Sequence, residues 1–214
     1  MPPLSLLKNI RNGQLPPLKS VPEPILDMLA GLSSVRGRLQ ELSSLERILV
    51  AFRHKEPDRV PVTPILCAGA RQITGFSFPD YSLDADKAAQ VFLDGFEFIG
   101  GDLVILMLDL SVEAADFGQR MEYPQDSTAF PDYNRPLIKD HHGYDRIQRI
   151  ELSGAPRMSE FVRLCQIMVK KIGLKGVVTG FVFGPLGALP MMRDAENLFK
   201  DCVLYPKKVK AACE

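Results

Sequence analysis

The run DLVILML, residues Asp102–Leu108, decides the fold because an unbroken series of apolar residues follows a single aspartate. A strand that is apolar on both faces is typical of a parallel sheet covered by helices. The pattern predicts a helix before this strand, ending at Gly100-Gly101, and a short helix after it, capped by Ser111. A second strong strand is predicted at Val177–Phe183. Strands that alternate with helices in this way predict an α/β protein.

The same alternation extends toward both ends of the chain. Ser43 and Glu46 have the spacing of a capping box at the start of a helix, which must end before Pro57. Val60–Val62 then suits the first strand of the sheet. In the C-terminal half, helices are predicted at Met158–Ile172, Ala195–Phe199 and Lys207–Cys213.

Residues 1–43 differ from the rest of the chain because prolines punctuate them. Proline is excluded from helix interiors and central strands, so only short helical pieces are predicted, at Leu4–Ile10 and Ile25–Leu32. We therefore interpret residues 1–43 as a helical arm and residues 44–214 as the main domain.

The composition excludes several classes of protein. Lys+Arg and Asp+Glu number 26 each among 214 residues, so the chain lacks the basic field of a nucleic-acid-binding or polybasic membrane-binding protein. The four cysteines are scattered, which favours a reducing, cytoplasmic setting over a disulfide scaffold. The most apolar stretch, Gly176–Met192, is broken by Pro185 and Pro190, so it predicts a buried strand and loop rather than a membrane span.

Nucleotide-binding and hydrolase motifs are missing from the sequence. We find no G-x-G-x-x-G, no phosphate-binding loop and no nucleophile elbow. A barrel of alternating strands and helices fits better, but a complete (β/α)8 barrel needs about 250 residues. The chain predicts fewer strands than that barrel contains.

Four motifs resemble the uroporphyrinogen decarboxylase superfamily. They are Glu46–Arg53 (ERILVAFR), Glu56–Val62 (EPDRVPV), Leu108–Gly118 (LDLSVEAADFG) and the turn Phe183–Pro185 (FGP). The resemblance implies a (β/α)8 TIM barrel with its active site at the C-terminal rim of the strands. Because the motifs are those of the family's first half, we expect an incomplete barrel, the N-terminal half, with a helical arm before it.

The superfamily contains two chemistries, decarboxylation of uroporphyrinogen and corrinoid-dependent methyl transfer. In the decarboxylases, two arginines of an R-Q-A-G-R-Y motif bind substrate carboxylates, and here Leu66 and Ala70 fall on those positions, with Arg71 one place out of register. Leucine and alanine cannot replace guanidinium groups as carboxylate partners. The resemblance therefore favours a methyltransferase acting on a small methylated or methoxylated molecule, with a corrinoid protein as partner.

Two alternatives stay open. The first is a uroporphyrinogen decarboxylase of porphyrin biosynthesis. The second is a non-catalytic half-barrel that needs a partner chain or forms oligomers, because an open sheet exposes unpaired edge groups.

The resemblance also bears on cofactors. The methyltransferase branch binds zinc through a His-x-Cys pair and a later cysteine in the second half of the barrel. In this chain His54, His141 and His142 have no metal-ligand spacing to the cysteines. We therefore expect no cofactor bound by this segment alone, and expect zinc and the corrinoid partner only of the full-length family.

Asp109 is the predicted catalytic residue because it follows the central strand, where a barrel places its chemistry. The resemblance adds Arg71, Cys67, Gly184 and Pro185 as predicted substrate-binding residues. Cys67 has a plainer interpretation as a small buried apolar residue. Glu113 is interpreted as an acidic residue favoured near a helix N-terminus, and Asp116 as a solvated surface residue.

Overall fold

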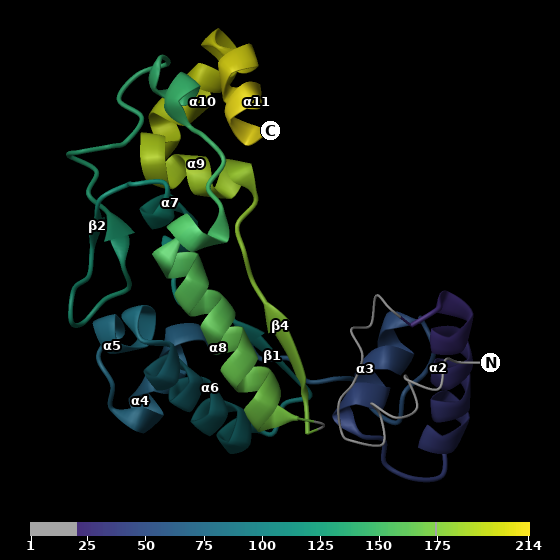
Figure 1. The fold of residues 1–214 in the computed structure, drawn as a ribbon. Helices are drawn as coiled ribbons and strands as arrows, with labels where there is room; N and C mark the ends of the chain where they lie inside the picture. Colours follow the sequence, from purple (N-terminus) through teal and green to yellow (C-terminus); the bar gives the residue numbers. More distant parts are fainter. Residues whose placement is uncertain (1–20, 174) are drawn as a thin grey trace. The chain divides into compact units, whose positions relative to one another are not determined.

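A computed structural model describes residues 21–173 and 175–214 of the chain. The chain divides into two compact units (Figure 1). The first unit contains the described part of Met1–Ile65 with Ile99–Val104 and Met168–Thr179, and the second contains Leu66–Phe98, Ile105–Ile167 and Gly180–Glu214.

The secondary structure confirms an α/β protein. The helices and strands are, in chain order, α2 (Glu23–Gly37), α3 (Ser44–Phe52), η2 (Cys67–Ala70), α4 (Arg71–Thr74), α5 (Phe78–Leu83), α6 (Ala85–Ile99), β1 (Leu103–Leu106), α7 (Val112–Asp116), β2 (Met121–Glu122), β3 (Phe130–Pro131), η3 (Gly143–Arg146), η4 (Leu152–Gly154), α8 (Pro156–Ile172), β4 (Val177–Gly180), α9 (Pro185–Arg193), α10 (Ala195–Leu204) and α11 (Pro206–Cys213).

Helices α2 and α3 pack side by side in the first unit (Figure 1). The predicted capping box of α3 is confirmed: the Ser43 hydroxyl accepts from the Glu46 N–H, and the Glu46 carboxylate accepts from the Ser43 N–H at 3.1 Å. The predicted helical piece Ile25–Leu32 lies within α2, whereas Leu4–Ile10 falls outside the described residues. The boundary drawn at residue 43 stays a prediction.

Strands β1 and β4 form a two-stranded sheet. The Val177 N–H donates to the Asp102 carbonyl at 3.0 Å, and the Phe181 N–H donates to the Leu106 carbonyl at 2.9 Å. Both partners advance together along the chain, so the pairing is parallel, as the apolar character of β1 predicts. A separate antiparallel pair joins β2 and β3, with Met121 opposite Pro131.

The strand predicted at Val60–Val62 is absent from the structure, so that prediction was wrong. Its backbone hydrogen bond to the residue before β1 runs from the Asp102 N–H to the Val62 carbonyl at 2.8 Å. The physical reason is that Pro61 and Pro64 have no N–H to donate. The Val62 N–H donates instead to the side chain of Asp102, at 2.8 Å.

Helices α9, α10 and α11 pack against one another in the second unit (Figure 1). They surround an apolar core whose buried members include Leu189, Met192, Leu198 and Val209. Within Gly176–Met192 the predicted strand is confirmed as β4, although it is only partly buried, whereas α9 shows that the predicted loop was wrong. Pro185 occupies the first turn of α9, where a missing N–H costs nothing, and the helix continues through Pro190 because apolar packing compensates for one lost bond.

Candidate functional site

Three of the predicted site residues line one cavity of about 310 Å³ in the second unit. Cys67 comes from η2, Arg71 from α4, and Asp109 from the segment that follows β1. Met107, Leu108 and Leu110 supply an apolar wall, while Gln72 and Thr128 add hydrogen-bonding groups. A concave apolar site with a few convergent polar groups is the usual form of a small-molecule site.

The carboxylate of Asp109 is held on both oxygens, and its side chain is 1% exposed. Oδ1 accepts hydrogen bonds from the Ser111 N–H at 2.8 Å and from the Ser111 hydroxyl at 2.5 Å. Oδ2 forms an ion pair with the guanidinium of Arg157. Ser111 occupies the predicted N-cap position of α7, but its hydroxyl donates to Asp109 instead of accepting from the N–H groups of that helix.

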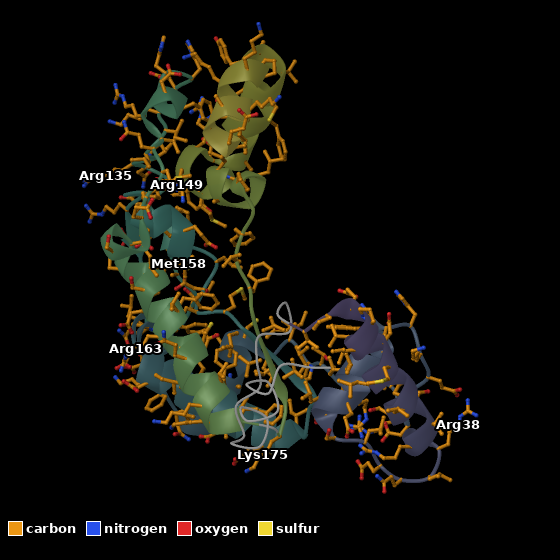
Figure 2. The ribbon with its side chains drawn as sticks, turned by 45° about the vertical axis from the view of Figure 1, so that its right-hand side comes forward. Arg38, Arg135, Arg149, Met158, Arg163 and Lys175 are labelled. Atoms are coloured by element: carbon orange, nitrogen blue, oxygen red, sulfur yellow. The ribbon has the colours of Figure 1, made fainter. Side chains whose placement is uncertain are left out.

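Arg157 is the site residue that the sequence does not reveal. It lies in the first turn of α8, immediately before Met158, which Figure 2 labels at the start of that helix. Its guanidinium also donates to the Ser82 carbonyl and lies 5.6 Å from the centre of the Tyr123 ring. Contacts to Ser82 of α5 and to the Tyr123 ring thus fix the guanidinium that neutralises Asp109.

Asp116 has a structural role that corrects its interpretation as a solvated residue. Its carboxylate accepts from the Arg157 N–H at 2.9 Å and from the Met158 N–H at 2.8 Å. These are free donors at the N-terminus of α8, so Asp116 caps that helix. The cap anchors the backbone that carries the Arg157 side chain.

Arg71 presents a guanidinium that forms no ion pair with any carboxylate among the described residues. It stacks on the Phe78 ring, with its Cζ 3.8 Å from the ring centre. Its Nη1 donates to the Phe76 carbonyl at 3.3 Å, and its buried Nε has no hydrogen-bond partner in the described part of the chain. A stacked guanidinium with unused donors is prepared to bind an anionic group.

Cys67 is half-buried at the edge of the same cavity. Its φ of 42° is in the left-handed region, which is unfavourable for a residue with a Cβ. Burial raises the pKa of the Cys67 thiol, so the sulfur is protonated near neutral pH. Nearby, Tyr81 is buried and donates its hydroxyl to the Met107 carbonyl, and burial holds the pKa of this phenol well above its ordinary value.

Gly184 and Pro185 lie apart from the Asp109 cavity. They line a different, strongly apolar cavity of about 530 Å³ with Cys202 and Cys213 of the last two helices. The structure therefore brings Cys67, Arg71 and Asp109 together and places the glycine–proline turn elsewhere. Gly187 in the next turn is sterically required, because a Cβ there would lie 2.4 Å from the Phe183 ring.

Glu113 connects α7, which follows β1, with the segment that follows β4. Its Oε1 accepts from the Phe183 N–H at 2.7 Å, so α7 holds the segment that follows β4. Glu113 and Asp109 also line the same small internal cavity of about 10 Å³. The interpretation of Glu113 as a helix-terminus residue is thus incomplete, because its carboxylate binds a distant backbone group.

Metal ligands and membrane spans are not found in the described residues. In 21–173 and 175–214, no group of three or more His, Cys, Asp or Glu side chains could hold a metal ion. No helix in those ranges is both long enough and apolar enough to span a bilayer.

Two comparisons connect this architecture with known proteins. The chain is 25% identical over 150 residues to methylcobamide:CoM methyltransferase MtbA of Methanosarcina mazei, an alignment that covers 69% of this chain and 44% of MtbA. A solved methyltransferase from Methanosarcina mazei has the same fold with a TM-score of 0.67 at 18% identity, covering 81% of this chain and 52% of that one. The chain therefore spans about half the length of these relatives.

The family comparison extends over the whole region that carries the site. The model of the family described as Uroporphyrinogen decarboxylase (URO-D) matches residues 43–214. That range includes Cys67, Arg71, Asp109 and Arg157, and it agrees with the motifs that suggested the resemblance. The chain belongs to the uroporphyrinogen decarboxylase family.

Proposed function

We propose that this chain binds a small methylated or methoxylated substrate with an anionic group, and serves methyl transfer between that substrate and a corrinoid protein. The observation that carries the proposal is the cavity at which Cys67, Arg71 and Asp109 meet. The similarity to a relative named as a methylcobamide methyltransferase supports the choice of reaction. On this proposal the chain supplies part of a (β/α)8 barrel.

Arg71 is the cation that would hold the substrate. Its stacking on Phe78 fixes the plane of the guanidinium. On this proposal its terminal nitrogens form a forked pair with a carboxylate or sulfonate. The apolar wall of Met107, Leu108 and Leu110 would then contact the methyl-bearing body. The Asp109–Arg157 pair adds little net charge to the cavity, so the Asp109 carboxylate does not repel the anion.

The decarboxylase alternative is supported less well by the same geometry. Ala70 is buried, and a Cβ on Gly95 would lie 2.8 Å from its methyl group and 3.0 Å from Leu66. The two positions that carry arginines in the decarboxylase motif therefore pack against α6. A single unpaired guanidinium on the cavity wall is poorly matched to a tetrapyrrole with eight carboxylates.

Cofactor chemistry is assigned to the partner and not to this chain. The corrinoid would supply the cobalt that carries the methyl group, on a separate protein. Since no three suitable ligands gather among the described residues, we assign no zinc-dependent step to them.

A binding and transfer experiment tests this proposal. Methoxyacetate is titrated into the purified chain by calorimetry, with 1-methoxy-2-propanol as an uncharged analogue. We expect methoxyacetate to bind, and Arg71→Gln to weaken it by about tenfold or more, since a charged hydrogen-bonding pair is lost. Arg146→Gln is the matched control, because Arg146 forms no ion pair among the residues described and lies outside the cavity.

The second arm of the experiment measures transfer. With cob(I)alamin as acceptor, the wild-type chain should convert methoxyacetate to glycolate with formation of methylcobalamin, and Arg71→Gln should slow it. Equal binding of the charged and uncharged molecules would contradict the role of Arg71. Binding without any transfer, with corrinoid protein also supplied, would favour the non-catalytic alternative.

A further inference from the structure

Another cavity, of about 330 Å³, is lined by Glu113 but not by Asp109 and lies within the second unit. Its wall includes Glu113, Phe117, Phe183, Ile147 and Met192, so a carboxylate and two aromatic rings line a largely apolar wall. Glu214 at the end of α11 adds further carboxylate groups to the same wall. It shares no lining residue with the Cys67–Arg71–Asp109 cavity. At about 30 Å³ for each water-sized group, the space accommodates a molecule of several heavy atoms.

The carboxylate of Glu113 is oriented but not neutralised. The Phe183 N–H fixes Oε1 at 2.7 Å, and no lysine or arginine in the described part of the chain pairs with Glu113. Arg149 also lines the cavity, but its side chain is 89% exposed and lies 3.5 Å from Glu151. A carboxylate has about four acceptor positions, so most of those on Glu113 stay free for a ligand.

The aromatic side chains add a preference for positive charge. The hydrogen bond to Glu113 comes from the backbone of Phe183, and both residues line this cavity. The Phe183 ring is also fixed by an edge-to-face contact with Phe181, at 5.2 Å between ring centres. Aromatic faces attract cations, and quaternary ammonium groups are bound in this way by rings that surround their methyl groups.

We propose that this cavity binds a small alkylated ammonium ion, with Glu113 neutralising its charge and Phe117 and Phe183 contacting its alkyl groups. Ile147 and Met192 provide apolar contact that a strongly hydrated metal cation would not use. The expected ligand is therefore an ammonium ion whose nitrogen carries methyl or other alkyl groups instead of hydrogens. This site is independent of the anion site at Arg71.

The test uses tetramethylammonium as the probe and tert-butanol as an uncharged molecule of similar shape. The chain carries 13C-labelled methionine methyl groups, and Met192→Leu assigns the signal of Met192, which lines the cavity. We expect tetramethylammonium to shift that signal in a saturable way, whereas tert-butanol leaves it nearly unchanged. Methoxyacetate should not move it, which separates this site from the one at Arg71.

Glu113→Gln is the decisive variant because the amide oxygen can still accept from the Phe183 N–H. We expect it to weaken tetramethylammonium binding by about tenfold or more, since a partly buried charge pair is lost. Glu151→Gln removes the same charge at an exposed position and should keep the affinity within about twofold. Phe117→Leu should weaken the cation by about threefold, the loss of one exposed cation–π contact.

Three results would overturn the proposal. They are equal binding of tert-butanol and the cation, an unchanged affinity in Glu113→Gln, or an equal loss in Glu151→Gln. Should Glu113→Gln melt at a lower temperature, Phe117→Leu provides the same comparison without altering the hydrogen bond to Phe183.

Discussion

Two arginine–aspartate clusters accompany β1 in the sequence, one before the strand and one after it. Asp102 precedes the strand and accepts from the Ser44 hydroxyl at 3.0 Å, the Arg59 Nη1 at 2.7 Å and the Val62 N–H at 2.8 Å. Arg47 joins it with an ion pair and is itself shared with Asp58. In this first cluster, protein donors bind both oxygens of the Asp102 carboxylate.

The second cluster follows the strand and has fewer internal donors. Asp109 relies on Ser111 and one arginine, and it opens onto the cavity that holds Cys67 and Arg71. In barrels built from such units, the N-terminal end of a strand contributes stability and the C-terminal end carries chemistry. Asp102 and Asp109 differ in the same way by position: both side chains are 1% exposed, but Asp109 is among the residues that line the cavity, whereas Asp102 is not.

The largest effect is expected from Arg47→Met. Arg47 is 2% exposed in its side chain and pairs with Asp58 and Asp102, so its loss leaves Asp58 without its ion-pair partner and Asp102 with Arg59 alone. We expect a loss of about 3–5 kcal/mol in the free energy of unfolding, measured with urea. Methoxyacetate affinity should stay unchanged in the molecules that remain folded.

Arg53→Met is the control for that variant. Arg53 also pairs with two carboxylates, Glu23 and Asp27, but these are mostly exposed. Surface ion pairs contribute little, so the urea curve should move only slightly. Equal destabilisation by the two substitutions would contradict the assignment of the first cluster to stability.

A smaller loss of stability, with an added loss of binding, is expected from Arg157→Met. Asp109 keeps the two donors of Ser111, so we expect about 3 kcal/mol, the lower end of the range for a broken buried pair. The uncompensated charge of Asp109 should also repel an anion at Arg71, and weaken methoxyacetate by about fivefold in calorimetry.

The double variant Asp109→Asn with Arg157→Met sharpens this prediction. Removing both charges should restore part of the affinity, because the repulsion disappears with the carboxylate. Arg163→Met provides the control on the same helix, where Figure 2 shows Arg163 beyond Met158 and its partner Asp86 is exposed. No recovery in the double variant would show that Arg157 acts through α8 and not through Asp109.

The sequence predicts those parts of the fold that depend on neighbouring residues. The capping box joins Ser43 and Glu46, which are three residues apart in the sequence. The apolar run of β1 can be recognised without knowing which strand pairs with it. Helix α9 was missed because Pro190 forbids a helix locally, whereas the core around Leu189 and Met192 stabilises one. Tertiary packing decided this segment against local preference.

The site was predictable to the extent that motifs mark strand ends. Asp109 was predicted because it follows the most apolar strand, Arg71 because of its place beside a family motif, and Cys67 because it follows the predicted first strand; the three line one cavity. Arg157 was missed because it lies 48 residues from Asp109, at the start of a helix with an ordinary amphipathic pattern. An arginine in such a position gives no signal of its partner, since the pairing is created by the fold.

The smallest effect concerns the acid stability of the first cluster. Hydrogen bonds from Arg47 hold the pKa of Asp58 well below its ordinary value. Burial would raise the pKa of Asp102, but its donors from Val62, Arg59, Ser44 and Arg47 together lower it. A carboxyl with a depressed folded pKa stabilises the protein above its unfolded pKa of about 4, and this contribution is lost as pH falls through the folded value.

The contribution of this cluster to the free energy of unfolding should therefore be nearly constant from pH 7 to about pH 5. It should then fall by roughly 1–2 kcal/mol toward about pH 2. Hydrogen exchange should show the amides of α3 losing protection over that interval. Asp58→Asn should reduce the acid dependence, because an amide cannot titrate. If α3 lost protection with falling pH as steeply in Asp58→Asn as in the wild type, the acid sensitivity would belong to other carboxyl groups. The charges of the first cluster would then not be what stabilises α3 against acid.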